Sequence, residues 1–468
     1  MSADRTRSLR VACLIRLLCC CVLVTCANYA HAADLSAHVV VISIDGFAGY
    51  LLDDPKAPVP TIRRLAKEGA QVVNGMVVSN PSVTWPNHTS IVTGVRPERH
   101  GVLANGVLVR GATNVPVIVD PRRDKSDLVR VPTIYDAAHV AKLTTAEINW
   151  PCTRGAPTLD DSFPDVPEAV ANSTPRLRTE LVAAGILGDE TDKTFSAGSV
   201  VGRDHLWTEA ACHVIQQRKP NLLFLHLLNV DATHHSLGPQ SPAGYTANAF
   251  ADACVSRVVA ALDAAGIRQQ TTLFIVADHG FAMTPKAILP NVLLRQAGLL
   301  QAERGKLTEA RVNVVPEGGI GLVYCNDRGT LAEDRRRVLE LFAGKEGVAE
   351  VLDPEQFAAH GLPHPREYDQ APDLVLVAKD GYGVSGSAEG ETFVATNTEG
   401  RISLGSHGLL SRSTKMNALC VISGRGIQRG AKIEKAENID LAPTIGRLLG
   451  LGEFPAQGRA LIEILVAK

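Results

Sequence analysis

The chain has 468 residues, which is enough for one large α/β domain with an insertion or for two to three ordinary domains. Hydrophobic residues make up 45% of it and charged residues 21%, a balance typical of globular proteins. The formal net charge of -2, without a Lys/Arg run beyond the N-terminus, gives no indication of a surface for a nucleic-acid polymer.

The first 32 residues have the order of a secretory signal. A basic start, "MSADRTRSLR", precedes the apolar stretch "VACLIRLLCCCVLVTCA", and "AHA" ends the segment with small residues suited to cleavage. The apolar stretch is short for a membrane span and no second one follows, so we expect no span in the mature chain. We predict a signal peptide over 1–32 and a periplasmic or secreted protein. A lipoprotein anchor at Cys26 is the alternative, although Thr25 fits that motif poorly.

The number of cysteines becomes odd once the predicted signal peptide is excluded. Ten are present, and five of them lie in the leader. An odd remainder in an exported protein leaves at least one thiol unpaired or bonded to another molecule. We expect buried small hydrophobic residues, or at most two disulfides, among Cys152, Cys212, Cys254, Cys325 and Cys420.

Three continuous apolar runs each end at a carboxylate. The runs are "HVVVISIDG", "NLLFLHLLNVD" and "TTLFIVADHG", and they deliver Asp45, Asp231 and Asp278 with His279. Such runs suit parallel strands that are buried on both faces, and the carboxyl ends of parallel strands meet at one edge of a sheet. A single Asp after a strand is more simply a turn former or helix cap. Three such ends, two with histidines close behind, favour a site.

Helical patterns alternate with these strands. Apolar spacing followed by Gly predicts helices over 61–70 and 245–266, and "IDLAPTIGRLLGLGE" near the C-terminus reads as a third. The alternation predicts a mostly parallel, doubly wound α/β sheet flanked by helices.

Residues 290–400 do not continue this alternation. Their pattern is typical of the strand and helix segments of a small α+β unit. We therefore predict an inserted cap at 290–400 within a catalytic α/β domain formed by 33–289 and 401–468. A looser stretch over about 107–200, rich in Pro, Asp and Arg, is a second candidate for a segment folded over the site.

The candidate ligands form two groups of residue types that zinc accepts. Asp231 and His235 are one helical turn apart, and His407 in "GSHG" could complete their site. A second ion would take the remaining set, with a hydroxyl as fourth ligand: Asp45, Asp278, His279 and Thr84. Six other histidines fit hydrogen-bonded or surface positions better than metal sites: His88, His100, His205, His226, His234 and His364.

Thr84 itself permits two interpretations. In "TWPNH" it precedes a proline-led helical start, where a Thr commonly caps the helix. The sharper hypothesis makes its hydroxyl a nucleophile beside paired metal ions, the usual device for in-line displacement at phosphorus. Two dications, three carboxylates and one alkoxide sum to zero charge, so metal loading should also stabilise the fold.

These motifs together resemble the alkaline phosphatase superfamily, and most closely its type I phosphodiesterase / nucleotide pyrophosphatase branch. The matching segments are "ISIDG", "TWPNHTSIVTGVRPERHGV", "DATHHSLGP", "ADHG" and "GSHG", spread from residue 39 to about 450. The resemblance implies two Zn²⁺ ions on the ligands named above and a phospho-threonine intermediate on Thr84. It also implies that Asn105, in "HGVLANGV", touches a phosphate oxygen.

The substrate stays open at this stage. The expected substrate is a small-molecule phosphate diester, pyrophosphate or nucleotide, because "INWP" lacks the extra cation pair of monoesterase relatives, although Arg154 lies near. A phosphomonoesterase, a phosphonoacetate-type C–P hydrolase and a non-catalytic phosphate- or metal-binding protein are the alternatives. A base would need an aromatic partner, and the candidates are Trp85, Trp150, Trp207 and Phe47. The sequence does not indicate an oligomeric state.

Overall fold

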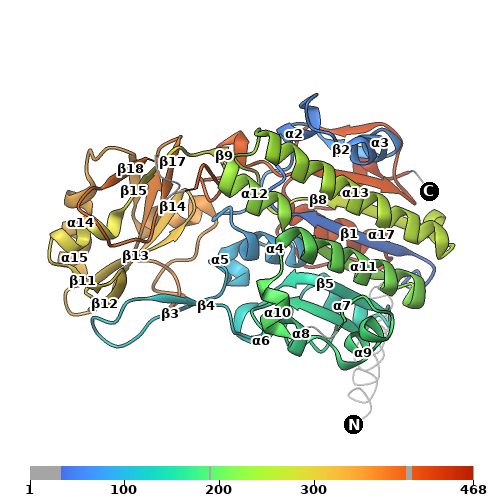
Figure 1. The fold of residues 1–468 in the computed structure, drawn as a ribbon, viewed down its shortest axis with the longest axis horizontal. Helices are drawn as coiled ribbons and strands as arrows, with labels where there is room; N and C mark the ends of the chain where they lie inside the picture. The colour runs from blue at the N-terminus through green and yellow to red at the C-terminus, as the bar shows by residue number, and fades with distance from the viewer. Residues whose placement is uncertain (1–32, 189–190, 397–402, 467–468) are drawn as a thin grey trace, which may run out of the picture.

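The computed structural model describes residues 33–188, 191–396 and 403–466. Figure 1 shows helices lying over a central sheet, with a second group of strands at the left. The central sheet has eight strands in the order β21-β2-β20-β8-β1-β7-β5-β6. The predicted signal peptide lies outside the described residues.

The three apolar runs form the centre of this sheet, as predicted. Strand β1 pairs in parallel with β7 on one side and with β8 on the other, and every residue of the three strands is buried. Their bounds are His38–Ile44 for β1, Leu222–Leu227 for β7 and Thr271–Val276 for β8. Their carboxyl ends therefore lie side by side at one edge.

The outer strands make the sheet mixed rather than fully parallel. Strand β20 (Cys420–Gly424) runs antiparallel to both β8 and β2 (Ala70–Val72), while β2 and β21 (Ala431–Ile433) are parallel. On the other side, β5 (Thr145–Pro151) and β6 (Asp161–Asp165) continue the parallel order from β7.

The position of β5 and β6 corrects the prediction for about 107–200. We expected a loose segment over the site, but these two strands form one edge of the central sheet. The reason is Glu147, which looks like a surface residue in the sequence. Its carboxyl is buried and accepts hydrogen bonds from the amide of Trp150 (2.8 Å) and the hydroxyl of Thr153 (3.2 Å). Satisfied hydrogen bonds allow a polar residue inside a buried strand.

The three predicted helices are confirmed with shifts of a few residues at their ends. They are α3 (Pro60–Glu68), α13 (Pro242–Ala264) and α17 (Leu441–Leu448). Helix α11 (Val200–Arg218) packs along α13, and both cross in front of β1 and β8 (Figure 1). Helix α17 packs against α7 (Ile134–Val140) and α4 (Thr84–Thr93).

The second group of strands has a hydrophobic core of its own. Its four-stranded antiparallel sheet has the order β13-β14-β16-β15, covered by α15 (Leu331–Phe342). The strand bounds are Val312–Glu317, Ile320–Cys325, Leu374–Ala378 and Val348–Leu352 in that order. Strand β10 (Lys286–Ile288) lies before the predicted boundary at residue 290, and it pairs with β17 (Tyr382–Val384) and β18 (Val394–Thr396). The domain boundaries at 290 and 400 stay a prediction.

Two further findings concern the described residues. Within them, all five cysteines beyond residue 32 are free of a disulfide bond, which agrees with the prediction of small hydrophobic residues. In the same part of the chain, no helix combines the length and apolar character needed to cross a membrane.

Candidate metal centre

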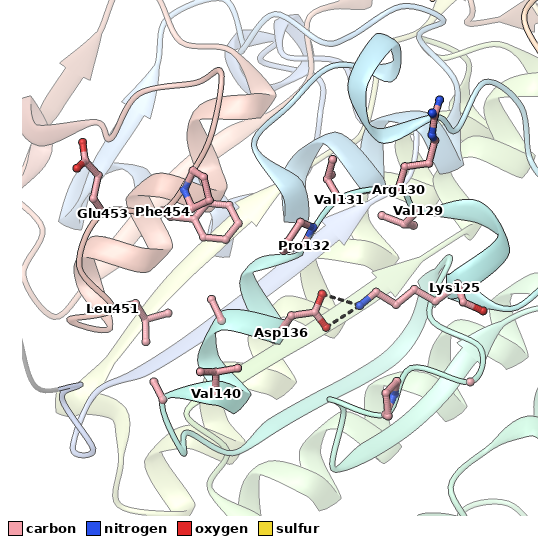
Figure 2. A pocket seen from close by; sticks show the side chains of 16 residues that line it. Lys125, Val129, Arg130, Val131, Pro132, Asp136, Val140, Leu451, Glu453 and Phe454 are labelled. Carbon is pink, nitrogen blue, oxygen red and sulfur yellow. Dashed lines mark hydrogen bonds and ion pairs between the residues drawn. The ribbon is translucent and has the colours of Figure 1, made fainter. Parts of the chain in front are cut away.

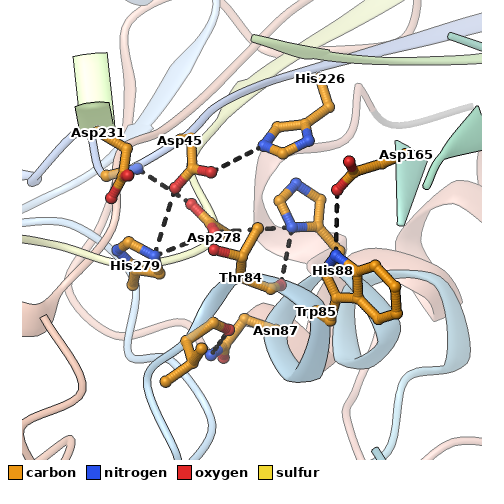
Figure 3. A network of polar contacts seen from close by, with 12 residues as sticks. Asp45, Thr84, Trp85, Asn87, His88, Asp165, His226, Asp231, Asp278 and His279 are labelled. Carbon is orange, nitrogen blue, oxygen red and sulfur yellow. Dashed lines mark hydrogen bonds and ion pairs between the residues drawn. The ribbon is translucent and has the colours of Figure 1, made fainter. Parts of the chain in front are cut away.

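The predicted site residues meet at the carboxyl edge of the central strands. Asp45 follows β1, Asp278 and His279 follow β8, and Asp231 lies in α12 (Asn229–Leu237), which follows β7. Figure 3 shows several of them grouped above the start of α4. Three elements that are distant in sequence thus supply one group of oxygen and nitrogen ligands.

The first group of ligands is fully buried and consists of Asp45, Asp278 and His279. Nε2 of His279 lies 3.3 Å from Oδ1 of Asp45 and 3.2 Å from Oδ2 of Asp278. The second oxygen of Asp278 accepts a hydrogen bond from the amide of Gly46 (3.1 Å). The predicted convergence of the adjacent Asp278 and His279 is confirmed, since both lie past the last residue of β8.

The second group joins Asp231, His279 and His407, with His235 next to them. Oδ1 of Asp231 lies 3.4 Å from Nε2 of His235 and 3.7 Å from Nε2 of His407. The one-turn spacing of Asp231 and His235 is confirmed by α12. The rings of His279 and His407 stack at 3.8 Å, so His279 stands between the two groups.

All three histidines turn Nε2 toward the site and Nδ1 away from it. Nδ1 of His235, His279 and His407 lies 3.1, 3.0 and 2.9 Å from the backbone carbonyl oxygens of Gly405, Gly280 and Ser82. A carbonyl oxygen only accepts, so Nδ1 carries the proton and the lone pair of Nε2 faces the carboxylates. This is the tautomer that a metal-binding histidine requires.

Four atoms at the centre have no hydrogen-bond partner among the described residues although they are buried: Oδ1 of Asp45, Oδ1 of Asp231, Oδ2 of Asp278 and Nε2 of His279. A buried polar atom without a partner is costly. Four of them facing one another fit a cation that would satisfy them together. The donor set of carboxylates and imidazoles is one that zinc accepts.

The pKa values of these groups point the same way. Burial, and then the nearby Asp278 and Asp231, hold the pKa of Asp45 well above its ordinary value. Burial raises the pKa of Asp278 to about 6 and lowers the pKa of His279 to about 4. The carboxylates therefore lack a compensating positive charge from the protein, which dications would supply.

Thr84 opens helix α4 without capping it. The N-cap position is Val83, and no side chain caps the helix there. The interpretation of the Thr84 hydroxyl as a helix cap is therefore wrong. The amide of Trp85 donates to Oδ1 of Asn105 at 2.9 Å, which places Asn105 beside Thr84 and leaves its amide nitrogen to donate elsewhere.

The family model described as type I phosphodiesterase / nucleotide pyrophosphatase matches residues 39–410. This chain belongs to the type I phosphodiesterase / nucleotide pyrophosphatase family. The resemblance inferred from the motifs is thereby confirmed. The family match covers all eight predicted site residues.

Curated relatives of this phosphodiesterase family member are similar at low identity. An uncharacterized pyrophosphatase/phosphodiesterase of Schizosaccharomyces pombe is 26% identical over 254 residues, which is 53% of this chain and 45% of that protein. Human ectonucleotide pyrophosphatase/phosphodiesterase family member 1 is 24% identical over 430 residues, 90% of this chain and 40% of that protein. The chain thus spans less than half the length of these two relatives.

Among solved structures, murine ectonucleotide pyrophosphatase/phosphodiesterase 5 has the same fold. It superposes with a TM-score of 0.68 at 19% identity, covering 92% of this chain and 100% of that one. The same murine protein is also known as an inactive threonine-to-alanine variant in complex with AMP. The predicted alkaline-phosphatase-like α/β fold of the phosphodiesterase family is confirmed.

The predicted stacking partners for a base do not line an open site. Trp85, Trp150, Trp207 and Phe47 are 5%, 0%, 2% and 0% exposed. Trp85 packs with Val102 and Leu128, and its indole N–H donates to Asp165. All four aromatic rings therefore belong to the packed interior, and the suggestion that one of them stacks on a base is not supported.

Arg154 likewise does not supply a cation to the centre. Its Nε donates to Oδ1 of Asp124 at 2.6 Å, and its other end donates to the carbonyl oxygen of Arg122. A different hollow, of about 810 Å³, lies between α7 and the segment 451–455 (Figure 2). None of the predicted ligands lines it, and its Lys125 is paired with Asp136 at 2.6 Å.

Two buried histidines adjoin the ligands, although the sequence did not indicate that they lie at the centre. His226 and His88 lie behind the ligands with ring centroids 4.1 Å apart, and both are hydrogen-bonded, as expected for non-ligands. Nδ1 of His88 also lies 3.6 Å from Oδ2 of Asp278. The available signal was a polar residue within an otherwise apolar strand, which for His226 pointed to the same sheet edge.

Proposed function

We propose that this chain is an exported phosphodiesterase or nucleotide pyrophosphatase that uses two zinc ions and Thr84. The observation that carries the proposal is the convergence of four buried, unpaired ligand atoms near the start of α4. The names of the human and yeast relatives, and the AMP bound to the murine neighbour, support a small phosphate ester or nucleotide as substrate. The leader over 1–32 supports export.

The ligands divide between two ions. Asp45, Asp278 and His279 would hold one together with Thr84, and the other would take Asp231, His235 and His407. When bound, the ions supply Lewis-acid stabilisation for the threonine oxygen and for the leaving oxygen. The resulting neutral site favours a diester, which carries one negative charge, over a monoester, which carries nearly two.

The chain's own residues perform the displacement. The oxygen of Thr84 attacks phosphorus while the bond from phosphorus to the leaving oxygen breaks, which gives a phospho-threonine. Water then attacks this phosphorus, and the bond to the Thr84 oxygen breaks to release phosphate ester or phosphate. The amide nitrogen of Asn105 donates to a non-bridging oxygen, because its Oδ1 is already held by the amide of Trp85. The positive end of α4 adds a favourable field.

The monoesterase and phosphonate alternatives have less support. The nearest candidate for an additional cation was Arg154, and it is engaged by Asp124. A dianionic monoester would therefore bring charge that no arginine at this position balances. We rank the diester or pyrophosphate first for this reason.

A comparison of substrates tests the proposal. We expect kcat/KM to be highest for bis(p-nitrophenyl) phosphate, lower for p-nitrophenyl phosphate, and lowest for phosphonoacetate. A chelator should abolish all turnover, and added zinc should restore it. Zinc-loaded protein that turns over none of the three would instead support a non-catalytic phosphate- or metal-binding protein. Faster turnover of phosphonoacetate would support the C–P hydrolase.

A further inference from the structure

Asp204 is a buried carboxyl group that the proposed chemistry does not use. It is 1% exposed and lies in α11, which packs against both β7 and α12. Burial raises its pKa to about 7, although backbone hydrogen bonds act in the opposite direction. Placing a carboxylate there is costly, so the hydrogen bonds that offset this cost indicate what the residue does.

The two oxygens of Asp204 accept from two consecutive backbone amides. Oδ1 accepts from the amide of Leu228 at 2.8 Å, and Oδ2 accepts from the amide of Asn229 at 2.9 Å. Leu228 is the N-cap residue of α12, and no side-chain hydrogen bond caps the helix from that position. The first amides of a helix have no partner within the helix itself. Asp204 therefore satisfies, from α11, two amides that the sequence of α12 leaves without an acceptor.

Helix α12 carries two ligands of the second group, Asp231 and His235. It has nine residues, and isolated helices shorter than about 12 residues are marginal in water, so its position depends on tertiary contacts. At the end that carries His235, the carbonyl oxygen of His235 accepts from the amide of Leu404 at 2.9 Å. The contacts with Asp204 hold the opposite end, just before Asp231.

We infer that Asp204 is a positioning residue that fixes the start of α12 and thereby places Asp231 and His235 for the second metal ion. The inference rests on the proposed metal centre and names a role for a residue outside the ligand set. Asp204 acts through the backbone of α12 and belongs to neither group of ligands.

A carboxylate is well suited to this role. Hydrogen bonds to an ionised acceptor are about twice as strong as those between neutral groups, and the start of a helix favours negative charge. Two bonds to one planar group fix both the distance and the direction of the first turn of α12. Metal binding requires ligand atoms within about 0.2 Å of their preferred distances, so a small shift of α12 should weaken it.

Asp252 provides a matched control. It lies in α13, is 4% exposed, and accepts from the amide of Ile62 at 2.8 Å and from that of Thr61 at 3.1 Å. These two amides belong to the first turn of α3, which carries none of the predicted ligands. Asp252 thus makes the same pair of hydrogen bonds as Asp204, but to a helix outside the metal centre.

The test compares Asp204→Asn with Asp252→Asn. Each substitution replaces one accepting oxygen with an amide nitrogen that only donates, with little change in size. Zinc affinity is measured by competition with a chromophoric chelator at about pH 8.5, where the carboxyl of Asp204 is ionised. We expect Asp204→Asn to weaken one of two zinc equivalents by about 10-fold and to leave the other largely unchanged. Asp252→Asn should bind both equivalents as the wild-type protein does.

Thermal unfolding with and without zinc provides a second measurement. Both variants should have lower unfolding temperatures than the wild-type protein, because each loses a buried hydrogen bond. Zinc should raise the unfolding temperature less in Asp204→Asn than in Asp252→Asn, since a weaker ligand stabilises less. If Asp204→Asn does not fold, Asp204→Glu replaces it. That variant keeps the charge, but its longer side chain displaces the start of α12, so we expect the same zinc equivalent to weaken.

Three results would overturn the inference. The first is wild-type affinity at both zinc equivalents in Asp204→Asn or its replacement. The second is an equal loss in the Asp204 and Asp252 variants, which would assign the effect to general stability. The third is wild-type protein that binds no zinc. This last result would overturn the proposed metal centre itself, and it is thereby distinguished from the first two.

Discussion

The two halves of the metal centre differ in their access to solvent. In the half formed by Asp45, Asp278 and His279, the side chains are at most 3% exposed. In the other half, the side chain of Asp231 is 19% exposed and that of His235 is 30% exposed. The first half lies at the ends of the two central strands, whereas the second depends on α12 and on the segment that carries His407.

Because the two halves differ in burial, they differ in how strongly they depend on a bound cation. Removing a carboxylate from water is expensive, and the cost grows with burial. The buried half therefore depends more strongly on a bound cation than the exposed half does. We expect the buried half to bind metal more tightly and the exposed half to exchange it with solvent.

Replacing Thr84 tests whether its hydroxyl takes part in the reaction or only in metal binding. Thr84→Ala should reduce turnover by more than about 10³-fold, because no other hydroxyl takes the place of the nucleophile. Zinc content should stay largely intact, since three ligands remain in the buried half. The measurement is kcat on a diester together with elemental analysis.

Thr93→Ala provides the matched control, because Thr93 is a buried threonine at the other end of α4 whose hydroxyl donates to the carbonyl oxygen of Thr89. The Thr93→Ala variant should keep the turnover rate of the wild-type protein. Full activity in Thr84→Ala would contradict the assignment of the nucleophile.

Asn105 is exposed and accepts a hydrogen bond from the amide of Trp85, and we expect it to act on the phosphate alone. Asn105→Ala should lower kcat by about 10²- to 10³-fold, as for the loss of one donor to a developing negative charge. Both zinc equivalents should remain bound, because Asn105 is not a ligand. A large loss of zinc with unchanged kcat in the reloaded protein would reverse this assignment.

Metal removal distinguishes the two halves directly. Timed treatment with a chelator should release zinc in two phases, the faster one from the exposed half. His407→Ala and Asp231→Ala should lower zinc occupancy by removing ligands of that half, and His407→Ala should eliminate the fast phase. Elemental analysis of samples withdrawn during treatment gives the result. Unchanged zinc in either variant would show that its residue is not a ligand.

The smallest expected effect concerns stability and involves Glu147. Burial raises the pKa of Glu147 from 4.5 to about 7, against the hydrogen bonds from Ser162, Trp150 and Thr153. The folded protein then holds this proton more tightly than the unfolded chain. The contribution of Glu147 to the free energy of unfolding should therefore fall by about 3 kcal/mol at most as the pH rises from about 4.5 to about 7. Above that pH the contribution should stay level.

Glu147→Gln removes this titration, so thermal unfolding of the wild-type and variant proteins over that pH range provides the measurement. Both proteins should be kept free of metal, because metal binding has a pH dependence of its own. A difference between the two unfolding temperatures that does not change with pH would contradict the prediction.

The sequence predicted the ligands better than their surroundings. Apolar runs ending at Asp45, Asp231 and Asp278 signal strand ends, because hydrophobic continuity and the common edge of parallel strands are local rules. The run containing Glu147 was not recognised as a strand, since its carboxyl is satisfied by residues from 150 to 162. The sequence could not rank the four aromatic candidates for a similar reason, because burial depends on what packs over a side chain.

The amino-acid sequence by itself determined the family, the sheet with its central strands and the set of candidate ligands. These features follow from residue types at fixed spacings along the chain. Only the tertiary structure decided which nitrogen of each histidine faces the centre, that His279 stands between two groups, and that Nε2 of His226 lies 3.1 Å from one oxygen of Asp45. Those properties depend on contacts between segments far apart in the chain, and no local spacing encodes them.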